Sequence, residues 1–216
     1  MTSRLRRVAI AFIAFAAMSV LVPPMIQASD AEASNHEAIS SFIVDLGDRA
    51  IGALTDKSLA PEVRQERFRK LLNEGLDLDY VARFVLGAYR RRADEQQMDK
   101  FKALLEENIV RNYAWRFRNY NGQQLRLLGV RDANRDSTIV ETEVEQTGDT
   151  PPIRVDWRVH QKDGQYKVID IVVEGISMMV TQRDEYVGYM RSNGGIDALL
   201  EALRKQNAAL ADRNQG

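Results

Sequence analysis

The stretch VIDIVVEGISMMVTQRDEYVGYM, residues 168–190, contains the change of pattern that decides the fold. Its first six residues are mostly β-branched or apolar and predict a strand. Glu174-Gly175 breaks that strand, and the chain beyond it looks helical. Apolar side chains nevertheless continue at positions 176–180, where a solvated loop is the ordinary expectation. A chain that leaves a sheet and stays apolar needs apolar material to contact.

Alternation of apolar and polar side chains predicts three more strands upstream, at 123–130, 137–146 and 153–161. In the second of these, valine and threonine alternate with glutamate, so one face of the sheet should be buried and the other solvated. Asp163-Gly164 is typical of the tight turn of a hairpin between 153–161 and 166–173. The predicted register of that hairpin pairs Val159 with Val168, Trp157 with Asp170, and Val155 with Val172.

Helical spacing dominates on both sides of the strands. Apolar residues from Ile39 onward predict a first helix, Pro61 suits the start of a second, and Asp77 and Asp94 suit the N-caps of two more. After residue 175 we expect a helix to about residue 192, a break at Gly194-Gly195 and a last helix. Helices, an antiparallel meander and helices again indicate an α+β fold with a curled sheet.

The first 28 residues have the pattern of a cleaved signal peptide. Three arginines precede the apolar run 8–22, which is short for a membrane span. We expect cleavage after Ala28, with cleavage after Ala31 or Ala33 and an uncleaved membrane anchor as alternatives. We also expect a flexible segment at 29–35 and an expendable tail at 207–216. Cleavage leaves four more acidic than basic residues, 31 against 27, so nucleic acid is not an expected partner. Without cysteine, the exported chain must be stabilised by its core.

Motifs of known chemistry are missing from the 216 residues: no Gly-rich phosphate loop, no metal-ligand spacing and no nucleophile elbow. We therefore expect no catalytic residue, cofactor or metal. His36 is interpreted as solvated, His160 as an exposed strand residue, and Asp156 as ion-paired on the outer face. Asp170 in its apolar strand has two interpretations: a buried acid that abstracts protons, as in curled-sheet isomerases, or a simple hydrogen-bond acceptor.

Large, soft apolar side chains are unusually frequent near the predicted sheet. Tyr113, Trp115, Phe117 and Tyr120 crowd the end of the helix that begins after Asp94, and methionines follow the last strand. Methionine adapts to irregular apolar shapes, as a ligand of variable length requires. Composition alone leaves two alternatives open, a ligand cavity and a filled core.

Several linked motifs resemble the MlaC family of periplasmic phospholipid carriers, also called toluene-tolerance auxiliary proteins. The similarity covers about residues 39–205. The matching segments are DYVARFVLGAY at 79–89, YAxxFxxY at 113–120, VDWR at 155–158, YKVIDI at 166–171, and VEGISM at 173–178 leading to Gln182-Arg183. Tyr166 stands where a tryptophan is commoner in the family pattern.

The resemblance implies a domain at 36–206 similar to the NTF2-like fold. Its curled-sheet part would comprise about 94–176 with the first helix, and a small helical subdomain would comprise about 58–92 and 177–206. The implied function is non-enzymatic: a periplasmic carrier would move phospholipid between an outer-membrane lipoprotein complex (MlaA-type) and an inner-membrane ABC transporter complex (MlaD-type), maintaining outer-membrane lipid asymmetry. Alternatives are a carrier of another lipid, such as a hopanoid, an enzyme using Asp170, or an adaptor with a filled core.

Under this interpretation the apolar residues after Gly175 face acyl chains. The expected wall residues are Tyr113, Phe117, Trp157, Ile171, Val173, Ile176, Met178, Met179 and Val180. Arginines suited to meet a phosphate at the mouth are Arg83, Arg90 and Arg183.

Overall fold

The computed structural model describes residues 27–215 except 118, 119, 121 and 135, so the predicted signal peptide lies almost entirely outside the described residues. The helices are α1 (Gln27–Thr55), α2 (Pro61–Gly75), α3 (Leu78–Val85), the 3-10 helix η1 (Gly87–Arg91), α4 (Glu95–Arg116), α5 (Met178–Asn193) and α6 (Ile196–Gln215). The strands are β1 (Gln124–Asn134), β2 (Ser137–Glu145), β3 (Ile153–Lys162), β4 (Gln165–Val173) and β5 (Ile176–Ser177). None of the helices in these ranges is long and apolar enough to cross a membrane.

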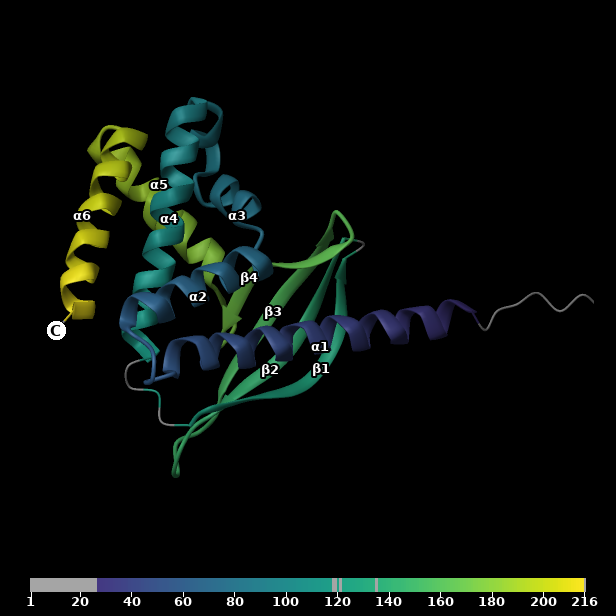
Figure 1. Cartoon of the computed structure of the whole chain (residues 1–216). Helices are drawn as coiled ribbons and strands as arrows, with labels where there is room; N and C mark the ends of the chain where they lie inside the picture. The colour runs from purple at the N-terminus through teal and green to yellow at the C-terminus, as the bar shows by residue number, and fades with distance from the viewer. Residues whose placement is uncertain (1–26, 118–119, 121, 135, 216) are drawn as a thin grey trace, which may run out of the picture.

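The strands form one open antiparallel sheet in the order β1-β2-β3-β4-β5, and α1 and α2 cross in front of it (Figure 1). This arrangement confirms the predicted α+β class. The fifth strand, only two residues long, was not predicted. It forms because Glu174 and Gly175 both adopt positive φ, at 49° and 79°, and turn the chain back onto β4. Glycine adopts such a conformation without steric cost, and the predicted break of the strand at Glu174-Gly175 is confirmed.

The predicted register of the β3–β4 hairpin is correct near the turn and wrong beyond it. Val159 pairs with Val168 as expected, but Ile169 is an extra residue in β4 that creates a β-bulge. Trp157 therefore pairs with Ile171, and Asp170 lies opposite Arg158. A shift of one residue moves a side chain to the other face of a sheet, so Asp170 does not face Trp157.

The two faces of the sheet differ in polarity, as the alternation in 137–146 predicts. Glu141 accepts ion pairs from Arg131 on β1, at 2.8 Å, and from Arg154 on β3, at 3.1 Å. Arg154 also pairs with Asp156 at 3.1 Å, which confirms the interpretation of that carboxylate as an ion-paired outer residue. The opposite, apolar face packs against α1 through a buried cluster of Ile39, Ile43, Val140, Val159 and Val168.

Side-chain caps fix the starts of two helices. Asp77 accepts a hydrogen bond from the Tyr80 amide at 3.0 Å, and Asp94 forms a capping box with Gln97. These caps confirm the expected helix starts at α3 and α4. Gly194, at φ 95°, ends α5 in the left-handed conformation at the predicted break.

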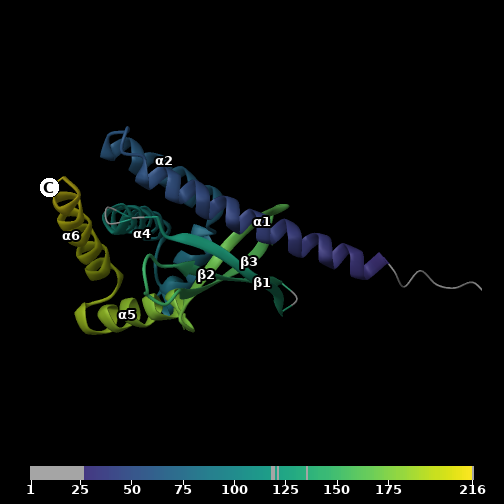
Figure 2. The same cartoon turned by 90° about the horizontal axis from the view of Figure 1, so that it is seen from below.

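The last helices form a second core on the side of the molecule away from the projecting end of α1 (Figure 2). Its largest buried side chains include Phe101 of α4, Met190 of α5 and Leu203 of α6. Asn108 of α4 donates to Asn207 of α6 at 2.8 Å, and both residues are buried. The division into a sheet part and a helical subdomain stays a prediction.

Both ends of the described chain are more ordered than their composition indicates. The segment 29–35, expected to be flexible, lies within α1, and the side chains of residues 32–35 are exposed there. At the other end, Asn207 and Leu210 are buried and α6 runs to Gln215, so the segment 207–216 is not a simple tail. Packing against α4 explains that difference.

Candidate functional site

Cross-strand pairing arranges the apolar face of the sheet into rows. We name the inner row Val130, Val140, Trp157 and Ile171, and the end row Leu127, Thr142, Val155, Val173 and Ile176. The inner row belongs to the cluster that packs against α1. The end row is buried in the middle but exposed at both edges, with Leu127 at 42% and Ile176 at 58%. Ile153, in the next position along β3 on this face, is 38% exposed.

Trp157 is held in a fixed orientation on this face. Its indole Nε1 donates to the Thr142 hydroxyl at 3.0 Å, and that hydroxyl donates to the Val155 carbonyl at 2.6 Å. The chain of two bonds satisfies the buried polar groups without placing a charge on the face. Trp157, Ile171 and Val173, predicted as wall residues, therefore share one face, and sequence reasoning missed Leu127 and Ile153 because their placement depends on the register.

The predicted aromatic residues of α4 form a separate cluster. The Tyr113 ring lies 5.7 Å from Phe68 of α2 and 6.4 Å from Phe117, which stacks on Tyr120 at 6.0 Å. This group extends a core of Leu54, Phe68 and Val110 that is distinct from the cluster on the sheet. Trp115 makes none of these ring contacts, in agreement with its different direction on the helix, and it is exposed.

Tyr113 is 36% exposed at the border of this aromatic cluster, and desolvation raises the pKa of its hydroxyl above the ordinary value. The described contacts include no hydrogen bond from this hydroxyl, so it is free to meet a polar group of a ligand.

The residues after Gly175 separate into two sets. Ile176, Met178 and Val180 are exposed. The exposed apolar edge of the sheet therefore continues from Ile176, the last member of the end row, into the start of α5. Met179 instead lies in the helical core. These side chains point in different directions because they belong to the first turn of α5. Ser177 caps this turn, and its hydroxyl accepts a hydrogen bond from the Val180 amide at 3.0 Å.

Asp170 anchors this same turn. One carboxylate oxygen accepts from the Ser177 hydroxyl at 2.6 Å and the other from the Met179 amide at 3.1 Å. The interpretation of Asp170 as a hydrogen-bond acceptor is confirmed. Its position on the face opposite Trp157 separates it from the apolar rows.

The three arginines predicted at a mouth lie on different elements. Arg183 of α5 stacks over the Phe84 ring of α3 at 5.2 Å, and Arg83 is exposed on the same helix as that ring. Arg90 is exposed in η1, before the start of α4. Eighteen residues of α4 separate Glu95 from Tyr113, which corresponds to about 27 Å of helix. Arg90 is therefore remote from the aromatic end of α4, and the guanidinium of Arg183 lies beside Gly87 of the same η1.

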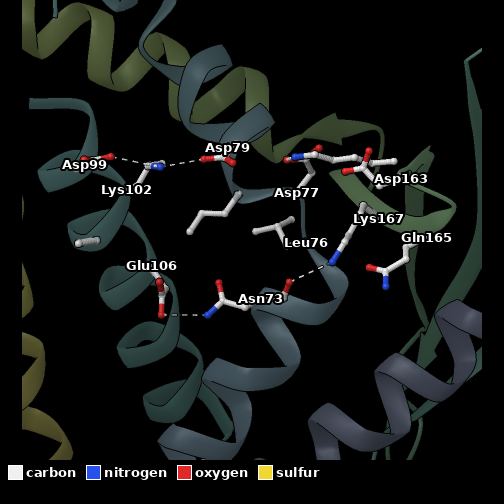
Figure 3. Close-up of a pocket in the computed structure, with 13 residues that line it drawn as sticks. Asn73, Leu76, Asp77, Asp79, Asp99, Lys102, Glu106, Asp163, Gln165 and Lys167 are labelled. Carbon is white, nitrogen blue, oxygen red and sulfur yellow. Dashed lines mark hydrogen bonds and ion pairs between the residues drawn. The ribbon is translucent and has the colours of Figure 1, made fainter. Parts of the chain in front are cut away.

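A polar groove of about 600 Å³ lies between α2, α3, α4 and the β3–β4 turn (Figure 3). Lys102 bridges Asp79 at 3.0 Å and Asp99 at 3.4 Å across it, and Lys167 donates to the Asn73 carbonyl at 3.2 Å. Sequence reasoning did not predict this groove, since its walls come from four distant segments. Charged walls with satisfied partners do not suit an acyl chain.

Asp77 is the buried centre beside this groove. Its carboxylate contacts His160 Nε2 at 3.0 Å and Lys162 Nζ at 2.9 Å. Burial alone would raise the pKa of Asp77, but hydrogen bonds from Lys162 and the Tyr80 amide outweigh it and hold the pKa below the ordinary value. His160 is thus partly buried and partnered, and its interpretation as an exposed strand residue is wrong.

Comparison with known proteins assigns the family. The model of the MlaC protein family matches residues 45–205. The chain belongs to the MlaC family. The intermembrane phospholipid transport system binding protein MlaC of Haemophilus influenzae is 28% identical over 133 residues. The toluene tolerance protein ttg2D of Pseudomonas putida is 22% identical over 136 residues.

Each of these alignments covers only part of the two proteins. They span 60% and 62% of this chain and 62% of each relative. The fold of this MlaC family member is shared with a phospholipid-binding protein of Ralstonia solanacearum, solved in complex with a phospholipid. The TM-score is 0.69 over 80% of this chain and 98% of the other, at 19% identity.

Proposed function

We propose that this MlaC family member is a phospholipid carrier that holds acyl chains against the apolar face of its sheet. The observation that carries the proposal is the end row, whose apolar side chains reach exposed edges at Leu127 and Ile176. The aromatic cluster at Tyr113 supplies a second apolar surface, in which Tyr113 is 36% exposed. The phospholipid bound to the Ralstonia protein of the same fold supports this class of ligand.

In the proposal, the wall of the site consists of residues from the sheet, the aromatic cluster and the start of α5. The members are Tyr113, Phe117, Trp157, Ile171, Val173, Ile176, Met178 and Val180, with Leu127 and Ile153 added from the register. Met179 supports the wall from the helical core. Arg83, Arg90 and Arg183 are the candidates for a phosphate, and the guanidinium of Arg183, which stacks on Phe84, also lies beside Gly87 of η1, the element that carries Arg90.

Transfer energetics favour a carrier over an enzyme. Two acyl chains contain about thirty methylenes, and burial of each is worth about 0.8 kcal/mol, or ~24 kcal/mol relative to water. The strongest non-covalent affinities reach only about 20 kcal/mol. A carrier must therefore match the bilayer from which it draws lipid, and its exchange requires no bond to be made or broken.

We further propose the cellular role that the family name suggests. After export by a cleaved signal peptide, the chain would act in the periplasm and carry phospholipid between an outer-membrane MlaA-type complex and an inner-membrane MlaD-type complex. Maintenance of outer-membrane lipid asymmetry would be the consequence. The name of the Haemophilus relative, an intermembrane phospholipid transport protein, supports this role.

Native mass spectrometry of protein purified from cells tests the proposal. We expect a mass increment equal to one phospholipid, released on denaturation and identified by lipid extraction. Detection of a polycyclic lipid such as a hopanoid would mean that the protein carries a different lipid. Protein purified without any bound lipid would support the alternative of an adaptor with a filled core.

A matched pair of variants tests the location of the ligand. Ile153→Glu places a charge on the apolar sheet face, whereas Val63→Glu changes a residue of similar exposure on α2, at 38% and 44%. We expect bound lipid to decrease only in Ile153→Glu. Equal lipid content in both variants, with native circular dichroism, would contradict the placement.

A further inference from the structure

Three potential metal ligands meet where the first turns of α1 pass the end of β1. His36 Nε2 lies 3.1 Å from Asp132 Oδ1, and ligand atoms of Glu32, His36 and Asp132 all lie within 4.8 Å of one another. Glu32 and His36 are four residues apart on α1 and therefore share one helix face. Spacing along the chain does not predict this group, because 96 residues separate His36 from Asp132. The interpretation of His36 as a solvated residue is therefore incomplete.

Two carboxylates and one imidazole meet at this place. Glu32 and Asp132 lie close together, and among the residues described here no lysine or arginine lies within 4.0 Å of either, so that His36 is the only neighbouring group that can carry a positive charge. Adjacent like charges repel each other unless a cation or a proton compensates them.

The other histidine of the chain shows what a balanced site looks like. His160 also contacts a carboxylate, that of Asp77, at 3.0 Å. There Lys162 lies 2.9 Å from the same carboxylate and supplies the positive charge. A metal ion would be repelled by that ammonium group, whereas at His36 the second carboxylate of Glu32 takes the place of the lysine.

We propose that Glu32, His36 and Asp132 bind a divalent transition-metal cation of the zinc class. One imidazole nitrogen and two carboxylate oxygens are ligands that zinc accepts, and zinc–ligand bonds of about 2.0–2.2 Å require ligand atoms about 3.3 Å apart. The His36–Asp132 distance of 3.1 Å already meets this requirement. Rotation of the exposed Glu32 side chain would bring its carboxylate to the same distance from the other two ligand atoms, and water would complete the coordination.

The site would fasten the first turns of α1 to the sheet. This part of α1 projects beyond the strands (Figure 1), and from residue 32 onward its first buried apolar side chain is Ile39. Besides the His36–Asp132 pair, the Tyr166 hydroxyl donates to Asn35 at 2.8 Å. A bound cation would add a strong link at this end of α1, independent of the proposed lipid site.

Calorimetric titration with zinc chloride tests the proposal, using the exported protein without a polyhistidine tag and treated with a chelator. We expect one zinc per chain, and at least a tenfold weaker affinity in His36→Ala and in Asp132→Asn. His160→Gln is the matched control, because it removes the only other histidine, and it should bind like wild type.

Thermal unfolding gives a second readout that does not require the variants to bind. Zinc at about a hundredfold excess over Kd should raise the Tm of the wild type by roughly 8 °C, and that of His36→Ala by about half as much or less. Metal-free His36→Ala should unfold close to the metal-free wild type, which shows that it folds. The proposal is overturned if millimolar zinc neither binds nor stabilises the wild type, or if His36→Ala responds equally.

Discussion

Replacement of Asp170 by alanine should destabilise the fold strongly without removing bound lipid. Asp170 is buried, and its carboxylate accepts from the Ser177 hydroxyl and from the Met179 amide. Asp170→Ala leaves both donors without an acceptor, and each buried unsatisfied group costs about 1–3 kcal/mol. The Ser177 hydroxyl is half-buried and regains water, so we expect a total loss of about 2–4 kcal/mol in the free energy of unfolding.

Urea denaturation followed by circular dichroism measures this loss, and thermal unfolding should show a fall in Tm of roughly 10 °C for a chain of this size. Ser177→Ala is the partner variant, and the double variant should be less destabilised than the sum, because both changes remove the same bond. Glu201→Ala removes an exposed ion pair with Arg204 and should unfold close to wild type. An Asp170→Ala protein as stable as that control would refute the assigned anchoring role, and lipid lost from correctly folded Asp170→Ala would refute its separation from the apolar face.

Three further predictions concern packing, pH and a buried bond. Gly75→Ala should cost about 1–2 kcal/mol in urea denaturation, because the new methyl group would lie 2.6 Å from the Leu46 side chain. Gly52→Ala, with no atom within 4 Å of the new methyl group, should instead stabilise α1 by about 0.5–1 kcal/mol. Because the folded-state pKa of Asp77 is lowered, its stabilisation is present above the ordinary pKa of 3.8 and is lost on acidification. Asp77→Asn should therefore be much less stable than wild type at pH 7, and the difference should become smaller as the pH falls below 3.8, as urea denaturation over a series of pH values would show. Trp157→Phe should lower the free energy of unfolding by only about 1 kcal/mol in urea denaturation. The variant loses the hydrogen bond from the indole, but the Thr142 hydroxyl still donates to the Val155 carbonyl.

Local features of this fold were predictable from sequence because short-range physics determines them. The alternation in 137–146 identified the charged and the apolar face, and Asp77 and Asp94 identified two helix starts. Gly175 and Gly194 identified the turn and the helix end, because both positions require positive φ. In each case the relevant side chain and the backbone it controls lie within a few residues of each other.

Features that depend on distant contacts were missed. The bulge at Ile169 changed the register of half the hairpin, and no local pattern in β4 marks it. The open apolar edge at Leu127 required the register of β1 with β2, and the polar groove required four separate elements. The pairing of His36 with Asp132 likewise follows from the docking of α1 on the sheet.

The bulge at Ile169 allows β4 to place a carboxylate at the start of α5 and apolar side chains on the opposite face of the sheet. With regular pairing, Asp170 would lie opposite Trp157, and a carboxylate would stand among the apolar rows, where an unpaired charge is costly. The extra residue Ile169 turns Asp170 toward the start of α5 and restores Ile171 and Val173 to the apolar face. The same single insertion therefore supplies the acceptor that anchors α5 and keeps the proposed lipid surface free of carboxylates. The chain is therefore apolar on both sides of Glu174-Gly175. The end of β4 before this turn belongs to the apolar face of the sheet, and the residues after it begin α5 at the edge of the same face.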